Sequence, residues 1–147
     1  MVDIVKQEEL LESIEQFFFA YRSFTAGPDR VLQERKLGRV HHRILYFVGR
    51  NPKLSVNALL SLLGVSKQAL NGPLRSLVEQ GLVVNQQHPE DLRIKQLSLS
   101  ATGKKLERQL TKIQMQQLES VFSRAGRKAM KDWQSIMKEI PLLQAQN

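Results

Sequence analysis

The segment from Ser55 to Leu99 constrains the fold of this chain more than any other stretch of the sequence. It contains two apolar runs with helical spacing around Gly64-Val65-Ser66, where glycine can end one helix and serine can cap the next. The second run places Leu70, Leu74 and Leu77 on one face, which predicts a buried stripe. Two short β-prone runs follow, with a polar loop between them. This order predicts a winged helix-turn-helix, whose second helix typically enters the DNA major groove.

The exposed positions of the second predicted helix carry side chains that suit contacts with DNA. Lys67 can donate to guanine acceptors or to a phosphate, whereas Gln68 and Asn71 can each form two hydrogen bonds with adenine. Arg75 lies further along and suits a phosphate, where contacts position the protein without reading the sequence. The alternative is a polar helix face that only meets solvent.

Gly72-Pro73 interrupts the second predicted helix. Proline removes one backbone donor and clashes with the carbonyl of Ala69, at a cost on the order of 3 kcal/mol inside a helix. We therefore expect either a kink between Ala69 and Gly72 or a helix that starts later. Either change would alter the angle at which this helix enters the groove.

The net charge of +8 favours an anionic partner, with nucleic acid first and an acidic membrane surface second, although solubility alone is a simpler explanation. The 147-residue chain has no cysteine, which excludes disulfides, thiolate catalysis and zinc fingers. The run Phe17-Phe18-Phe19-Ala20 is too short to span a bilayer, and no signal peptide is visible. These features predict a cytoplasmic protein that binds no membrane.

Two regions outside the central segment carry long apolar stripes. One lies within residues 8–24 and is followed by Ala26-Gly27-Pro28-Asp29, which predicts a helix end. The other, residues 101–145, predicts a long helix, a break at Arg124-Ala125-Gly126 and a last helix. The stripes comprise Leu10, Ile14, Phe17 and Tyr21 in the first region and Met130, Trp133, Met137 and Ile140 in the last helix. Internal core is one interpretation, but the narrow last stripe favours helix pairing between subunits.

Together these elements predict one domain over residues 1–147, mainly α with a small β-wing (α+β). Residues 38–100 would form the winged-helix lobe that binds DNA. Residues 8–24 and 101–145 would form dimerisation helices on either side of it.

Residues 38–108 resemble the core of the MarR (multiple antibiotic resistance regulator) family. The resemblance rests on the order and spacing of four pieces, Leu59-Leu60-Ser61-Leu62-Leu63-Gly64-Val65-Ser66 leading into Leu70 and Leu77, Glu79-Gln80-Gly81-Leu82-Val83, Pro89-Glu90-Asp91-Leu92-Arg93, and Leu97-Ser98-Leu99-Ser100-Ala101-Thr102-Gly103. It implies a homodimeric transcription regulator, usually a repressor, whose wing arginine enters the minor groove. It also implies that small, often aromatic, anionic ligands bind between the dimerisation helices and the DNA-binding lobe and release many such proteins from DNA.

The resemblance also assigns residues in the wing. Asp91 and Arg93 match the Asp-x-Arg wing tip, where the carboxylate can orient the guanidinium toward a narrow minor groove; a local salt bridge is the alternative. Leu92 stands where the family often has a second basic residue, which weakens the electrostatic grip of the wing. The full set predicted to bind DNA is Ser66, Lys67, Gln68, Asn71, Arg75, Asp91, Arg93 and Lys95.

A basic helix preceding the central segment supplies the candidate ligand site. The residues concerned are Arg39, His41, His42 and Arg43, because the pocket of the family lies near this helix and an arginine can pair with a ligand carboxylate. A solvated basic face near DNA is the alternative. No carboxylate at helical spacing completes a metal pair there, and no nucleophile–base pair or phosphate loop stands out. We therefore predict no catalytic residue, no metal, no cofactor and no enzymatic activity.

The residues predict a dimer that binds a pseudo-palindromic operator in double-stranded DNA. The family resemblance adds the expectation of a homodimeric repressor with a small aromatic or anionic ligand as a candidate effector. Two alternatives remain open. A winged-helix protein-interaction module would use its charge only for solubility and would expose an apolar patch, for which Leu92 is the candidate. A non-specific architectural DNA binder would show no preference among sequences.

Overall fold

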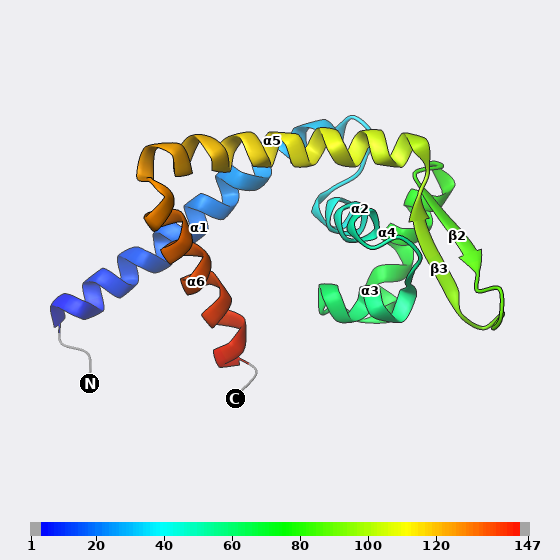
Figure 1. Cartoon of the computed structure of the whole chain (residues 1–147), viewed down its shortest axis with the longest axis horizontal. Coiled ribbons are helices and arrows are strands. Elements are labelled where there is room, and N and C mark those ends of the chain that lie inside the picture. The colour runs from blue at the N-terminus through cyan, green and yellow to red at the C-terminus, as the bar shows by residue number, and fades with distance from the viewer. Residues whose placement is uncertain (1–3, 145–147) are drawn as a thin grey trace. The chain divides into compact units, whose positions relative to one another are not determined.

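The computed structural model of the chain describes residues 4–144, with side chains described from residue 6 onward (Figure 1). The elements in chain order are α1 (Ile4–Gln33), α2 (Arg39–Arg50), β1 (Leu54–Ser55), α3 (Val56–Leu63), α4 (Lys67–Glu79), β2 (Val83–Gln87), β3 (Lys95–Leu99), α5 (Ala101–Ala125) and α6 (Arg127–Gln144). The chain forms two compact units, which meet between Ile113 and Gln114 within α5. The described part of the chain contains no helix both long enough and apolar enough to traverse a lipid bilayer.

A three-stranded antiparallel sheet carries the wing of the first unit. Its strand order is β1-β3-β2, so β3 lies in the middle. Val83 pairs with Leu99 at the base of the β2–β3 hairpin, and Leu54 of β1 pairs with Leu97 on the other side of β3. The mainly helical fold with a small β-wing is thereby confirmed, and β1 adds a short third strand to the two that the sequence predicts.

The two helices of the helix-turn-helix begin and end where their capping residues place them. The Ser55 hydroxyl accepts a hydrogen bond from the Ala58 amide (3.1 Å), and the Ser66 hydroxyl accepts one from the Ala69 amide (3.1 Å). Gly64 ends α3 in the left-handed conformation, with φ of 64°. Because Ser66 already caps its first turn, α4 starts at Lys67 and runs through Pro73. The expected later helix start is therefore wrong, and the expected kink between Ala69 and Gly72 stays a prediction.

The predicted end of the first helix at Ala26-Gly27-Pro28-Asp29 is also wrong, because α1 continues to Gln33. Tertiary packing outweighs the local helix-breaking signal here. Pro28 and Leu32 are fully buried, and Gly27 lies close to Ile113 of α5, so this turn is held by contacts remote in sequence. By contrast, the predicted break near residue 125 is confirmed by Gly126, whose φ of 98° separates α5 from α6.

The hydrophobic core of the first unit lies among α2, α3, α4 and the sheet. The predicted stripe of α4 is confirmed, since Leu70, Leu74 and Leu77 are all buried. Other helices and strands contribute Ile44, Leu45, Val48, Leu59, Val83, Leu97, Leu99, Leu106 and Leu110, and the turn between α4 and β2 contributes Leu82. This shared core fixes α4 against the sheet and leaves its opposite face in solvent.

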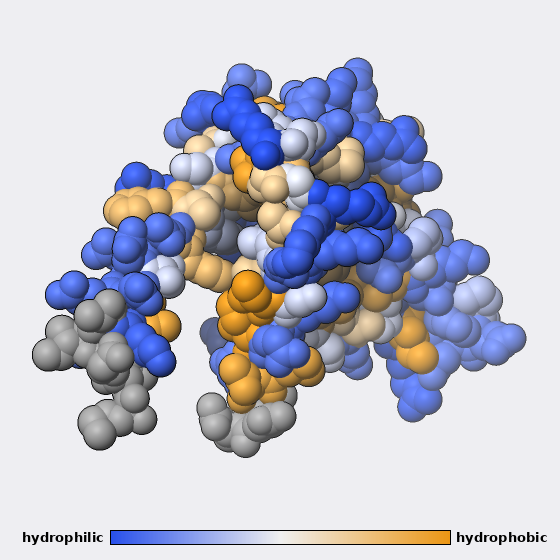
Figure 2. Space-filling view, turned by 60° about the vertical axis from the view of Figure 1, so that its left-hand side comes forward, coloured by the Kyte–Doolittle hydropathy of each residue, from blue (hydrophilic) through white to orange (hydrophobic). Residues whose placement is uncertain are grey.

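Helix α6, in the second unit, has an apolar stripe but buries none of its described residues. Trp133 contacts Phe122 of α5, with ring centroids 5.4 Å apart. Further along, Ile136, Ile140, Leu142 and Leu143 are exposed. Figure 2 shows an orange patch over this helix, in the lower part of the view. An apolar surface of this kind typically marks an interaction site.

Candidate nucleic-acid interface

Helix α4 presents a polar face opposite its buried leucines. Lys67, Gln68, Asn71 and Arg75 are all exposed, so the four side chains predicted from the sequence are free of the core. Ser66, the fifth predicted residue of this group, uses its hydroxyl to cap the helix. The structure thus gathers these residues on and beside the first turns of α4, the part of a recognition helix that contacts base edges.

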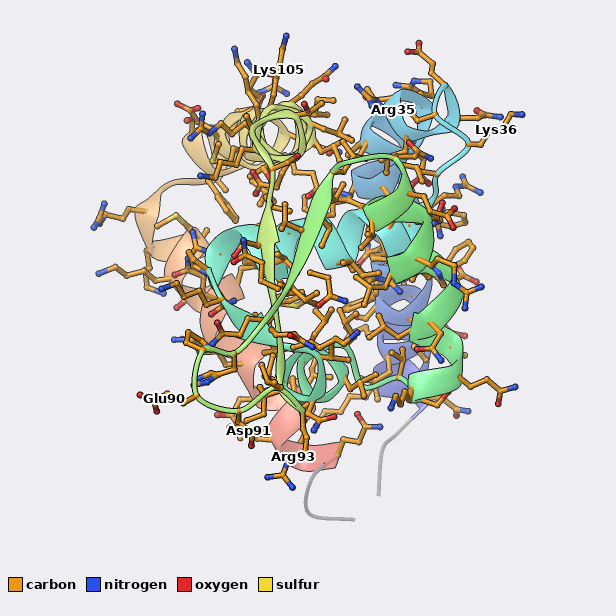
Figure 3. All side chains as sticks on the ribbon, turned by 90° about the vertical axis from the view of Figure 1, so that its right-hand side faces the viewer. Arg35, Lys36, Glu90, Asp91, Arg93 and Lys105 are labelled. Atoms are coloured by element: carbon orange, nitrogen blue, oxygen red, sulfur yellow. The ribbon has the colours of Figure 1, made fainter. Side chains whose placement is uncertain are left out.

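The wing tip holds Asp91 and Arg93 in a two-pronged ion pair (Figure 3). Arg93 Nε donates to Asp91 Oδ1 and Arg93 Nη2 donates to Asp91 Oδ2, both at 3.1 Å, and the Arg93 amide also donates to Asp91 Oδ1 at 3.0 Å. These hydrogen bonds lower the pKa of Asp91 and raise that of Arg93, so both groups are charged at neutral pH. The Arg93 side chain is still 90% exposed, which leaves its outer N–H donors available to a partner.

Backbone hydrogen bonds shape the loop that presents this pair. The His88 amide donates to the Ile94 carbonyl at 2.8 Å, and the Ile94 amide donates to the Asp91 carbonyl at 3.0 Å. Leu92 is exposed at the tip, and Lys95, the remaining predicted DNA-binding residue, is exposed at the start of β3. The loop is thus a tight, hydrogen-bonded turn around a protruding arginine.

Asn85 is a candidate residue that the sequence reasoning missed. A hollow of about 260 Å³ lies between α4 and β2, lined by Asn71, Leu74, Arg75, Val78, Glu79 and Asn85. Strand alternation was the available signal, because Asn85 lies two residues after buried Val83 and so shares its face. The structure thus brings the side-chain amide of Asn85 to the same hollow as Asn71 and Arg75.

The other cations of the first unit are not all near the wing tip. Figure 3 shows Arg35, Lys36 and Lys105 at the end of this unit opposite Asp91 and Arg93. A DNA-binding surface around Arg93 would therefore include only some of the positively charged side chains of the chain. Lys105 consequently offers a matched control for Arg93.

The predicted ligand residues of α2 are engaged with α1 or with the helix cap. Arg39 Nε donates to Asp29 Oδ2 at 2.9 Å, and Arg43 donates to the Tyr21 hydroxyl. The imidazole of His41 accepts a hydrogen bond from the Gly38 amide at 2.9 Å, so this side chain helps to cap α2. The structure thus brings the two arginines to one face of α1, and it adds Asp29 and Tyr21 to the set predicted from sequence.

His42 is the buried member of this group, with 8% of its surface exposed. Burial lowers its pKa, Asp29 raises it and Arg43 lowers it, with burial the largest effect. Asp29 Oδ1 is buried and has no hydrogen-bond partner among the described residues. Within residues 4–144, no group of three or more histidine or carboxylate side chains could hold a metal ion.

We expect acid to destabilise the fold through His42. Because its folded-state pKa lies below the ordinary value of 6.5, the unfolded chain binds more protons, and stability present above pH 6.5 is lost as the pH falls below it. Between pH 7.5 and 5.5, the urea midpoint of His42→Gln should therefore fall less than that of the unsubstituted protein. His88→Gln, in the wing loop, serves as the control. Equal falls in all three proteins would contradict a buried neutral His42.

An exposed, capped helix beside a hairpin that presents an arginine defines a winged helix-turn-helix, the class of fold whose second helix typically enters the DNA major groove. A sequence profile described as the MarR family matches residues 36–94. The HTH-type transcriptional regulator PetP of Rhodobacter capsulatus is 41% identical to this chain over 131 residues, which cover 89% of this chain and 79% of PetP. The chain therefore belongs to the MarR family and is a DNA-binding transcriptional regulator, not an enzyme.

Solved structures share the fold at low sequence identity. The S. aureus MepR–DNA complex matches with a TM-score of 0.71 at 16% identity, covering 86% of this chain and 93% of that chain. NadR in complex with 4-hydroxyphenylacetate matches with a TM-score of 0.72 at 22% identity, covering 85% of this chain and 89% of that chain. A SlyA-like regulator from Listeria monocytogenes gives a TM-score of 0.74 at 14% identity, covering 99% and 91%.

Proposed function

We propose that this chain is a homodimeric, sequence-specific repressor that binds a pseudo-palindromic operator and is released from it by a small anionic ligand. The observation that carries the proposal is the exposure, within one unit, of the polar face of α4 and of Arg93 at the wing tip. Two recognition helices related by twofold symmetry would enter successive major grooves, roughly 34 Å apart. We propose a cytoplasmic location together with this function.

The two parts of the interface would read DNA in different ways. Gln68 and Asn71 suit adenine in the major groove, whereas Lys67 and Arg75 suit guanine or phosphate. Arg93 would enter the minor groove, whose negative potential is strongest where the groove is narrow. The Asp91 carboxylate aligns the guanidinium before DNA is bound, so less side-chain entropy is lost on binding.

Dimerisation would cover the apolar surfaces of the flanking helices. Ile136 and Ile140 on α6 are 63% and 48% exposed, and α1 exposes Leu10, Leu11, Ile14, Phe17 and Phe18. A second copy of the chain is the partner that a twofold operator requires. We accordingly assign residues 38–100 to the DNA-binding lobe, and residues 8–24 and 101–145 to dimerisation, within one domain of residues 1–147. Residues 1–3 and 145–147 of these ranges lie outside the described residues.

We expect the double substitution Ile136→Asp/Ile140→Asp to convert the dimer to monomers. Two carboxylates in the apolar stripe would be desolvated without partners on association, which disfavours the dimer. Sedimentation should then give the 16.9 kDa protomer mass instead of twice that value. Leu62→Asp, at an exposed position on α3, should stay dimeric. A double variant that remained dimeric would remove α6 from the proposed interface.

The proposed effector site lies between α1 and α2. Arg43 and Tyr21 together suit a ligand with a carboxylate and an aromatic ring, and Asp29 offsets much of the charge of Arg39. 4-Hydroxyphenylacetate, the ligand of the NadR complex, has this chemistry. Such a ligand would release DNA by favouring a dimer whose helix spacing does not match the operator.

Selection of bound duplexes from a random DNA pool at near-physiological salt tests the proposal. We expect an enriched inverted repeat, which supplies the operator for all later measurements. Binding without enrichment, fading as salt rises, would indicate an architectural DNA binder instead. Absence of binding at low salt, with ligand-free protein, would indicate a protein-interaction module.

A further inference from the structure

Gly72 occupies an exposed position inside α4, where glycine is a poor choice on helix propensity alone. Glycine in a helix interior usually has a packing reason, because its missing Cβ lets another group come close. The described helices contain four glycines, and the surroundings of each can be compared.

Three of these four glycines have such a reason. A Cβ on Gly27 would lie 2.8 Å from Ile113 Cγ2, one on Gly49 2.9 Å from Leu99 Cδ1, and one on Gly103 2.0 Å from the Leu82 carbonyl oxygen. A Cβ on Gly72 would meet no atom within 4 Å, its chain neighbours and the backbone of its own helix aside. Tertiary packing within the chain therefore does not explain Gly72.

The position of Gly72 on the helix is specific. Each residue turns an α-helix by about 100°, so Gly72 lies roughly 200° around the axis from both Leu70 and Leu74, which are buried. Gln68, four residues before it, and Arg75, three residues after it, lie on the same face. Gly72 thus forms a notch in the middle of the face that points away from the core, between two side chains predicted to bind DNA.

We propose that Gly72 is a close-approach position, at which the C5-methyl group of a thymine in the operator enters the notch between Gln68 and Arg75. This inference rests on the proposed insertion of α4 into the major groove. The thymine methyl is the apolar group that base pairs present there, and a bare helix backbone accommodates it where a side chain would hold the base pair away. Gly72 then contributes to sequence preference without making any hydrogen bond.

Pro73 supplies the competing explanation. The ring of a proline crowds the Cβ of the preceding residue when that residue is helical, so glycine at position 72 also relieves a local clash. The two explanations separate when Pro73 is replaced by alanine, because the clash is then absent. In that background, a purely structural role predicts that Gly72→Ala leaves DNA binding unchanged.

The experiment measures operator affinity for Pro73→Ala and for Gly72→Ala/Pro73→Ala, using the selected operator and a copy in which deoxyuridine replaces thymidine. We expect the double variant to melt at the same or a higher temperature but to bind the thymine operator about tenfold more weakly than Pro73→Ala. On the uracil operator, which lacks the methyl groups, the difference between the two variants should shrink to about twofold or less. Ser61→Ala, at an exposed position on α3, is the control for a change in helix propensity.

Two results would overturn the inference. One is equal affinity of the two variants for the thymine operator, and the other is a loss that persists undiminished on the uracil operator. Gln68→Ala and Arg93→Ala distinguish this failure from failure of the proposed function. If they weaken binding while adding Gly72→Ala to the Pro73→Ala protein does not, only the proposed role of Gly72 is wrong. If Gln68→Ala and Arg93→Ala also leave binding unchanged, the proposed interface is wrong.

Discussion

Arg93→Ala is expected to weaken binding to the selected operator by about 5-fold to 150-fold, corresponding to roughly 1–3 kcal/mol for one well-placed contact. The Arg93 side chain lies at the wing tip and is 90% exposed, and its guanidinium donates two hydrogen bonds to Asp91. Because its contacts are confined to the wing loop, its removal should change the free energy of unfolding by less than about 0.5 kcal/mol. Titration of labelled operator at fixed salt measures the effect.

Lys105→Ala provides the matched control for Arg93→Ala. It also removes one positive charge, but from the opposite end of the same unit (Figure 3). We expect it to leave operator affinity within about twofold of that of the unsubstituted protein, because surface charges further apart than a Debye length, about 8 Å at physiological salt, are largely screened. If the two variants lost affinity equally, the role of Arg93 would reduce to net charge.

Gly103→Ala is expected to give the largest loss of stability among single substitutions in the wing region. A Cβ at this position would lie 2.0 Å from the Leu82 carbonyl oxygen and 2.9 Å from its carbon. A backbone group cannot swing aside as the end of a side chain can, so α5 and the base of β2 must separate. Overpacking of this kind costs about 1–3 kcal/mol, and melting should fall by about 5–10 °C.

The contacts around Ser100 would be lost together with the close approach of Gly103. The Ser100 hydroxyl accepts from the Gly103 amide at 3.0 Å and donates to the Gly81 carbonyl at 2.6 Å, and the Ser100 amide donates to the Leu82 carbonyl at 3.0 Å. Lys104→Ala, at the next and exposed position, should melt within about 1 °C of the unsubstituted protein. If the melting temperature of Gly103→Ala also stayed within about 1 °C of that of the unsubstituted protein, this junction would tolerate a methyl group.

Local signals were sufficient to predict the helix-turn-helix. Ser55, Gly64 and Ser66 act through groups within four residues of themselves, and the spacing of Leu70 and Leu77 already defines a buried face. The wing followed equally well, because its two strands are neighbours in sequence. The exposed side chains of α4 could be predicted for the same reason, because helix positions outside the leucine stripe are expected to face solvent. Arg93 could be predicted to be exposed because it lies in a polar turn. Whether these residues bind DNA stays a prediction.

Features that depend on contacts between residues far apart in the sequence could not be predicted in this way. The helix-breaking signal of Gly27 and Pro28 is real, but burial of Leu32 and the contact with Ile113 outweigh it. The pairing of Arg39 with Asp29 joins two helices, and no periodicity within either helix indicates it. Asn85 likewise approaches α4 only because the sheet packs against that helix.

The sequence by itself determined the order, caps and buried faces of the central helices and the position of the wing, because these depend on interactions between residues close along the chain. Only the tertiary structure decided that α1 continues past Pro28 and that Gly103 touches Leu82. It also decided that Gly72 has no packing neighbour beyond its own helix. The physical reason is common to all three, because what a glycine or proline costs or permits depends on which distant atoms lie beside it.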